Sequence, residues 1–267
     1  MNRLVVLEMR ESVAVLHLNR PEKRNAVNDE LRAELIDGLE GIAGDRSVRA
    51  LVLTGNGNGF CAGGDVSAMA GRLELPPSEV GVRGWERQQR VHRAQSLLHE
   101  LPIPTIAAVN GAAAGLGADM AMACDFVVAS SAAAFTWSYI HRGLIADGGG
   151  LYLLPRRVGL ARTKELIFSG RKVEAQEALR LGIADRISSP EGLLAEAVAW
   201  AEELTKGSRT AIALGKAMLN QSFETSLASL FAQGSQAQAL CYTSTEHRES
   251  VVAFLQNMPP TPGKGDV

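Results

Sequence analysis

Two glycine-bearing loops in this chain have residue types that could do chemistry. They read "GFCAGGDV" and "NGAAAGLGADM", and each follows a short apolar run. Both lead into predicted helices, whose first turns offer N–H groups without partners and a partial positive charge of roughly +0.5. Small residues let an anionic oxygen approach such N–H groups closely. If the two loops converge, they predict an oxyanion hole.

Each loop alone has a simpler explanation, because glycine also eases a turn from strand to helix. The second loop has the order G-x-x-x-G-x-G, and no Gly-Lys-Ser/Thr sequence follows either loop. These patterns exclude a dinucleotide-binding fingerprint and a phosphate-binding P-loop.

Two aspartates are candidates for proton transfer. Asp147 lies in "GLIADGGG", where apolar residues precede it and three glycines follow. Burial there would remove its solvation and suit it to general base catalysis, although aspartate before glycine is also common in turns. Asp119 comes just after the second loop, where it either belongs to the site or only complements the helix dipole.

Other reactive residue types are weaker candidates. The histidines are scattered, and no histidine or cysteine has the spacing of a metal ligand. Cys61 borders the first loop without an identifiable activating partner, so we expect it to act as a small apolar residue. Lys23 and Arg24 follow a proline and either contact a phosphate group or face solvent.

The composition indicates a globular protein with one large domain, or one domain and an appendage. Of 267 residues, 46% are hydrophobic and 21% charged, and the net charge is −2. This balance favours neither a nucleic-acid nor a membrane partner. The N-terminal apolar run is too short for a signal peptide, and the three cysteines do not suggest a disulfide framework. We therefore expect a cytoplasmic protein.

Strands and helices alternate in the part of the chain that must position these residues. We predict an α/β core over 1–190 with parallel crossover units, a helical region over 191–258, and a disordered tail over 259–267. Within the core, apolar periodicity predicts two strands in 3–21, a helix in 28–45, strands at 49–54, 105–109 and 124–130, and a helix over 112–123. Residues 71–83 hold two prolines and predict a surface loop, followed by a helix over about 84–100.

Several segments together resemble the crotonase superfamily, which includes enoyl-CoA hydratases and isomerases. The resemblance spans about residues 3–256 and rests on "NRPEKRNAV", "FCAGGDV", "PTIAAVNGAAAGLGADMAMACDFVVAS", "GLIADGGGLYLLPRRVG" and "SGRKVEAQEALRLGIAD". It implies a spiral α/β core of β-β-α units and a C-terminal helical region that forms homotrimers or hexamers. It also implies acyl groups carried as coenzyme A thioesters in fatty acid metabolism. No metal or redox cofactor is implied, since coenzyme A belongs to the substrate.

The same resemblance assigns roles to individual residues. The thioester oxygen would accept hydrogen bonds from the backbone N–H groups of Gly64 and Leu116. We expect the segment "WERQQRVHRAQSLLHELP" and the surface loop before it to wall the acyl pocket. The residues expected along the coenzyme A moiety are Arg24, Ala26, Ala62, Asp65 and Val66.

The carboxylates depart from the pattern of the family's hydratases. Those enzymes use two glutamates, one at the place of Asp119 and one at the place of Tyr139. A tyrosine with an ordinary pKa near 10 is a poor substitute for a carboxylate base, so we place Tyr139 among the substrate-binding residues. Dienoyl-CoA isomerases and the ring-epoxide isomerases of phenylacetate breakdown carry an aspartate at the place of Asp147.

We therefore expect an isomerase in which Asp147 is the base and Asp119 assists or shapes the site. Two alternatives stay open. One is an enoyl-CoA hydratase that holds water between the two aspartates. The other is an acyl-CoA-binding or RNA-binding relative with little catalysis.

Overall fold

The computed structural model describes residues 3–71 and 74–256, and its contacts divide the chain into two units, Met1–Lys206 and Gly207–Val267. The sequence predicts a helical region that begins at residue 191, whereas the two units divide after Lys206. The division falls later because α8 (Leu193–Leu204) buries Leu193, Ala197 and Ala201 against the sheet of the first unit. The expected tail over 259–267 lies outside the described residues.

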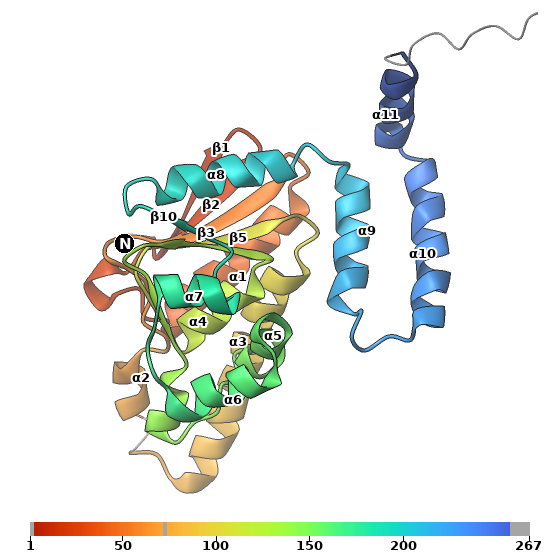
Figure 1. The fold of residues 1–267 in the computed structure, drawn as a ribbon. Helices are drawn as coiled ribbons and strands as arrows, with labels where there is room; N and C mark the ends of the chain where they lie inside the picture. Colours follow the sequence, from red (N-terminus) through yellow and green to blue (C-terminus); the bar gives the residue numbers. More distant parts are fainter. Residues whose placement is uncertain (1–2, 72–73, 257–267) are drawn as a thin grey trace, which may run out of the picture. The chain divides into compact units, whose positions relative to one another are not determined.

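A six-stranded sheet forms the frame of the first unit (Figure 1). Its spatial order is β1-β2-β3-β5-β7-β10, in which β1 and β2 are antiparallel and all other neighbours are parallel. The central strands are apolar and buried throughout, as in a parallel sheet covered on both faces. The strands are β1 (Val5–Arg10), β2 (Val13–Leu18), β3 (Ala50–Gly55), β5 (Thr105–Val109), β7 (Phe126–Ser130) and β10 (Arg186–Ser188).

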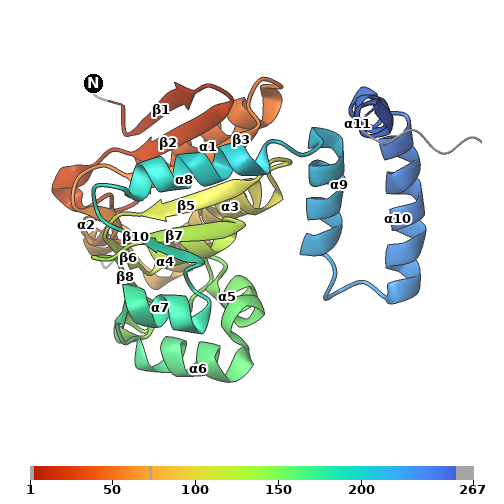
Figure 2. The ribbon, with the colours of Figure 1, turned by 45° about the horizontal axis from the view of Figure 1, so that its top comes forward.

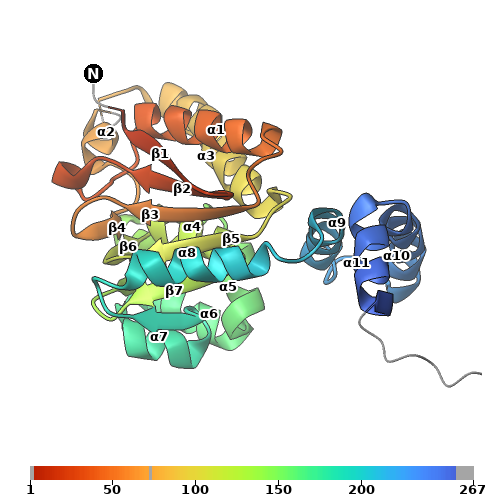
Figure 3. The same cartoon turned by 90° about the horizontal axis from the view of Figure 1, so that it is seen from above.

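Helices cover both faces of this sheet. Alternate strand residues point to opposite sides, so that Val52 and Ile106 pack with α8 while Leu51 and Leu53 join the larger core. Figure 2 and Figure 3 show α8 along one face, where it contacts β3, β5 and β7. The larger core is closed by α1 (Asp29–Gly44), α3 (Pro77–Glu100) and α4 (Leu116–Ala123).

A second sheet makes the fold a spiral of β-β-α units, as the resemblance implied. Its order is β4-β6-β8-β9, and each of the consecutive pairs β3/β4, β5/β6 and β7/β8 gives one strand to each sheet. The predicted helix over 112–123 is wrong for Ala112–Ala114, because these residues pair in register with β8 and form a strand. The strands are β4 (Gly59–Cys61), β6 (Ala112–Ala114), β8 (Ala134–Thr136) and β9 (Val173–Glu174).

The helix α3 begins at Pro77, so residues 77–83 are helical and not part of the predicted loop. Proline is tolerated in the first turn of a helix, where its missing N–H would have no partner. An ion pair of 2.7 Å between Glu79 and Arg83 supports the same turn. The prolines therefore mark a helix start.

Shorter elements complete the first unit, and the described part of the second unit, residues 207–256, contains three helices. The first unit adds the 3₁₀ helices η1 (Pro21–Lys23) and η2 (Ser138–Arg142) and the helices α2 (Val66–Ala70), α5 (Gly150–Val158), α6 (Leu160–Ser169) and α7 (Ala175–Leu181). The second unit contains α9 (Arg209–Asn220), α10 (Leu227–Tyr242) and α11 (Thr245–Gln256). Within the described ranges, no helix has the length and apolar character needed to cross a membrane.

Candidate active site

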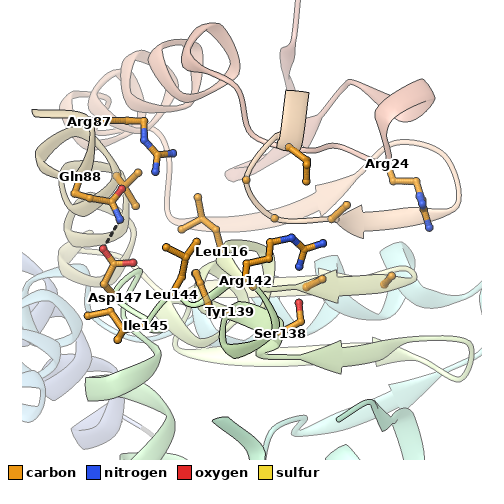
Figure 4. A pocket seen from close by; sticks show the side chains of 18 residues that line it. Arg24, Arg87, Gln88, Leu116, Ser138, Tyr139, Arg142, Leu144, Ile145 and Asp147 are labelled. Atoms are coloured by element: carbon orange, nitrogen blue, oxygen red, sulfur yellow. Dashed lines mark hydrogen bonds between the residues drawn. The ribbon is translucent and has the colours of Figure 1, made fainter. Parts of the chain in front are cut away.

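A cavity of about 400 Å³ lies in the first unit (Figure 4). Its walls come from the loop after β4, the turn between β6 and α4, η2 with the segment that follows it, and α3. The helix over 84–100 therefore lines this cavity, while its contact with an acyl group stays a prediction. The polar side chains that line the cavity are Arg24, Arg87, Gln88, Ser138, Tyr139, Arg142 and Asp147.

The two glycine-bearing loops converge at this cavity, and Gly64 and Leu116 both line it. A Cβ atom on Gly63 would lie 2.6 Å from the carbonyl oxygen of Ala114 and 3.6 Å from the nitrogen of Leu116, so the two backbones touch. Gly63 and Gly115 both adopt positive φ, at +91° and +51°, which glycine tolerates without strain. Glycine at these places is therefore needed for the approach of the loops.

The backbone N–H groups of Gly64 and Leu116, called here the amide pair, are available to a ligand. Leu116 is the first residue of α4, where the helix supplies no acceptor. At the other loop, Gly63 and Asp65 make the hydrogen bonds to Val27, and Gly64 does not. In the described part of the chain, neither amide donates to a protein acceptor. Two unpaired donors at one cavity are what an oxyanion hole requires.

Asp147 lines the cavity from the segment before α5 and is held by α3. Gln88 Nε2 donates a hydrogen bond to Asp147 Oδ2, and His92 Nε2 lies 3.6 Å from the same oxygen. The Asp147 side chain is 24% exposed, so the carboxylate is half-buried and the expectation of a buried one is wrong. Its carboxylate is therefore in reach of solvent as well as of the cavity, which exposed Leu144 and Ile145 also line.

Asp119 is the fully buried aspartate, and it does not line the cavity. Its Oδ1 accepts a hydrogen bond of 2.9 Å from Trp137 Nε1, and its Oδ2 accepts one of 2.6 Å from the Tyr139 hydroxyl. Burial raises the pKa of Asp119 to about 7, opposed by these two hydrogen bonds and reinforced by the charge of Asp147. Tyr139 lines the cavity, so Asp119 is linked to it through Tyr139.

The glycines after Asp147 bring the start of α5 against Asp119. A Cβ atom on Gly148 would lie 2.6 Å from Asp119 Oδ2, and one on Gly150 would lie 2.5 Å from Oδ1. The backbone of Gly150 also donates a hydrogen bond to this carboxylate. The motif "ADGGG" therefore presents Asp147 to the cavity and encloses Asp119 beneath it.

The residues expected along coenzyme A divide into two groups. Arg24, Ala62 and Val66 line the cavity, whereas Ala26 and Asp65 do not. These last two hold the guanidinium of Arg20, which donates to the Ala26 carbonyl at 2.6 Å and to Asp65 at 3.0 Å. The hydrogen bond from Arg20 keeps the pKa of Asp65 below its ordinary value.

Sequence reasoning missed several polar groups near the cavity. Gln88 and His92 are four residues apart on α3, and this helical spacing was the one available signal for their shared face. Nothing in the sequence pointed to Ser138 or Arg142, which line the cavity from η2.

Cys61 acts as the small apolar residue that the sequence predicts. The Cys61 thiol is buried and donates to the Asn25 carbonyl oxygen at 3.1 Å, and burial raises its pKa to about 12. A thiol of this kind is a poor nucleophile. Across residues 3–71 and 74–256, no cluster of three His, Cys, Asp or Glu side chains is placed to hold a metal ion.

Comparison with known proteins finds relatives of two reaction types. The family model described as enoyl-CoA hydratase/isomerase matches residues 8–262. The chain is 34% identical over 253 residues to the crotonyl-CoA hydratase of Syntrophomonas wolfei, which covers 94% of this chain and 95% of that protein. It is also 34% identical over 260 residues to the 1,2-epoxyphenylacetyl-CoA isomerase of Escherichia coli, covering 97% and 98%. The crystal structure of enoyl-CoA hydratase from Mycobacterium smegmatis superposes with a TM-score of 0.87 at 32% identity, covering 97% and 99%.

Proposed function

The chain belongs to the enoyl-CoA hydratase/isomerase family, and from this premise we propose that it isomerises an acyl-coenzyme A thioester with Asp147 as the base. One observation carries the choice of reaction. Among the described residues that line the cavity, Asp147 is the sole carboxylate, while the buried Asp119 is separated from the cavity by Tyr139. A single carboxylate suits a proton that leaves one carbon and is replaced at another.

The amide pair would bind the thioester oxygen. Removal of a proton beside the thioester moves its electron pair toward this oxygen, and the two N–H groups stabilise the negative charge that develops there. Asp147 takes that proton. Gln88 fixes the orientation of the carboxylate through its hydrogen bond to Oδ2.

The reaction ends when a proton is added to a different carbon of the acyl group. In a 3-enoyl thioester the proton leaves C2 and one is gained at C4, so that the double bond shifts and no atom is lost or added. Arg24, at the cavity edge, would meet the coenzyme A moiety as a cation.

Hydration of a 2-enoyl thioester is the second candidate. It is favoured by the names of the relatives, among which hydratases predominate. In that reaction a water molecule would add across the double bond, with Asp147 as the carboxylate in reach.

A panel of 2-enoyl, 3-enoyl and dienoyl thioesters separates these reactions. Isomerisation leaves the product mass unchanged, and NMR locates the new double bond, whereas hydration adds the mass of water. We expect Asp147→Asn to remain folded and to lose roughly 10²- to 10⁴-fold in kcat. Asp37→Asn, which changes an exposed aspartate on α1, is the matched control. Binding of every thioester without turnover would instead support an acyl-CoA-binding protein.

We also propose that the protein forms trimers or hexamers in the cytoplasm. The second unit leaves many large apolar side chains exposed, and association between copies would cover them. Sedimentation of the purified chain as a monomer would contradict this proposal. The exposed residues are Leu219, Phe223, Leu227, Phe231, Leu240, Phe254 and Leu255.

A further inference from the structure

The isomerase mechanism leaves one buried acid without a role. Asp119 has no exposed surface, and both its carboxylate oxygens are hydrogen-bonded. Besides burial, the groups with the largest effect on its pKa are Tyr139, Trp137, Asp147 and Gly150, and none of these is a cation. Burying a carboxylate without a cationic partner is unfavourable for folding, and such groups concentrate at functional sites.

Tyr139 connects this buried acid to the cavity. Its hydroxyl donates to Asp119 Oδ2 at 2.6 Å, and its side chain lines the cavity. A Cβ atom on Gly148 would lie 3.2 Å from the Tyr139 hydroxyl oxygen and 2.7 Å from Leu116 Cδ1. Figure 4 shows Tyr139 near Leu116, with Asp147 held by Gln88 at another side of the cavity. The hydroxyl therefore lies near one residue of the amide pair.

We infer that Tyr139 is the second proton-transfer group of this site, and that the buried Asp119 positions its hydroxyl and supplies it with a proton. This inference rests on the proposed isomerisation. Asp147 removes a proton from one carbon, and Tyr139 delivers a different proton to the other carbon.

The hydrogen bond between Asp119 and Tyr139 allows the tyrosine to deliver a proton to the substrate. An ionised Asp119 only accepts, so Tyr139 must donate to it and presents lone pairs to the cavity. A protonated Asp119 donates to the tyrosine oxygen, which leaves the phenolic proton free to point into the cavity. The raised pKa of Asp119, about 7, keeps both states populated near neutral pH.

The transfer balances without a further reactant. The Tyr139 O–H bond breaks as a C–H bond forms on the substrate, and the carboxyl proton of Asp119 moves to the tyrosine oxygen. Asp119 is left as a carboxylate and Asp147 as a carboxylic acid. Asp147, which is partly exposed, then releases its proton to solvent, and Asp119 regains one through Tyr139 from water that enters after product release. Burial and the charge of Asp119 raise the pKa of Tyr139, so the phenol remains protonated between turnovers.

The origin of the incoming proton tests the inference in the wild-type protein. The assay follows 3-hexenoyl-CoA, or whichever panel thioester isomerises fastest, in D₂O at low conversion. Two proton-transfer groups predict that nearly every product molecule carries one solvent deuterium at the newly protonated carbon. A single shuttling carboxylate predicts that much of the product retains the proton removed from the substrate, and that result would overturn the inference while leaving isomerisation intact.

Substitution of the tyrosine provides a second, independent measurement. We expect Tyr139→Phe to lower kcat by roughly 10²- to 10⁴-fold with a much smaller change in KM, and to raise the share of product that keeps the substrate's own proton. Tyr152→Phe, which changes a tyrosine outside the cavity, should match the wild type. Wild-type rate and labelling in Tyr139→Phe would contradict a role in proton transfer. Failure of the wild type to isomerise any thioester would instead refute the proposed function.

Discussion

Replacing Asp119 with asparagine should remove a pH dependence from the stability of the first unit. The pKa of this carboxyl is raised from 3.8 to about 7 by burial, so over this range the folded chain holds a proton that the unfolded chain has released. The free energy of unfolding therefore falls as pH rises from about 4 to about 7, and the stabilisation is complete only below the unfolded pKa.

The size of this effect follows from the two pKa values. At about 1.4 kcal/mol for each pH unit between them, ionising Asp119 costs the folded state on the order of 4 kcal/mol. Roughly 2–3 kcal/mol of this falls between about pH 5 and pH 8, the interval in which a denaturation series is practical. Asparagine does not titrate. The free energy of unfolding of Asp119→Asn, taken relative to that of the wild type, should therefore increase by this amount as the pH rises from about 5 to about 8.

Urea denaturation followed by tryptophan fluorescence measures the difference. Trp85, Trp137 and Trp200 are the three tryptophans of the chain and all lie in the first unit, so their signal reports that unit alone. Asp37→Asn should follow the wild type at every pH. A difference between wild type and Asp119→Asn that stays constant within about 0.5 kcal/mol over this interval would refute the assignment of Asp119 as a carboxyl whose ionisation is opposed by burial.

Two further predictions concern the contacts around the aspartates. Gly150→Ala should destabilise the protein by about 1–3 kcal/mol, since its Cβ would lie 2.5 Å from Asp119 Oδ1 and 3.1 Å from the Trp137 ring. Gly41→Ala, whose Cβ meets no atom within 4 Å, should be neutral or slightly stabilising in the same urea denaturation experiment. An equal loss of stability in both variants would argue against crowding at Asp119. Gln88→Glu should move the acidic limb of the kcat/KM profile to higher pH, because a second carboxylate beside Asp147 disfavours its ionised form. Gln89→Glu, on the exposed face of α3, should leave the profile in place, and an unchanged profile in Gln88→Glu would contradict the contact.

Patterns of neighbouring residues in the sequence were sufficient to predict much of the main sheet and its helices. The strands β3 and β5 were predicted because their residues form short apolar runs, and these are buried on both faces of the sheet. The helix α1 was predicted from its apolar periodicity, and in the structure the Asn28 side chain caps it by accepting a hydrogen bond from the Leu31 N–H. The loops at Gly64 and Leu116 were likewise located from small residues that follow strands.

Two features that depend on a distant partner were not predicted. Ala112–Ala114 have high helix propensity, yet they form β6 because β8 offers them a register of backbone hydrogen bonds. The same holds for the contact between Gln88 and Asp147, which joins residues 59 positions apart.

The sequence by itself determined which residues were available for chemistry: two loops of small residues, two aspartates and a tyrosine in place of a carboxylate. Only the tertiary structure decided their roles. Both aspartates stand among apolar residues and glycines, but α5 closes over Asp119, while Asp147 remains partly exposed beside α3. Burial depends on which distant segments pack against a side chain, and the neighbours of a residue along the chain do not specify them.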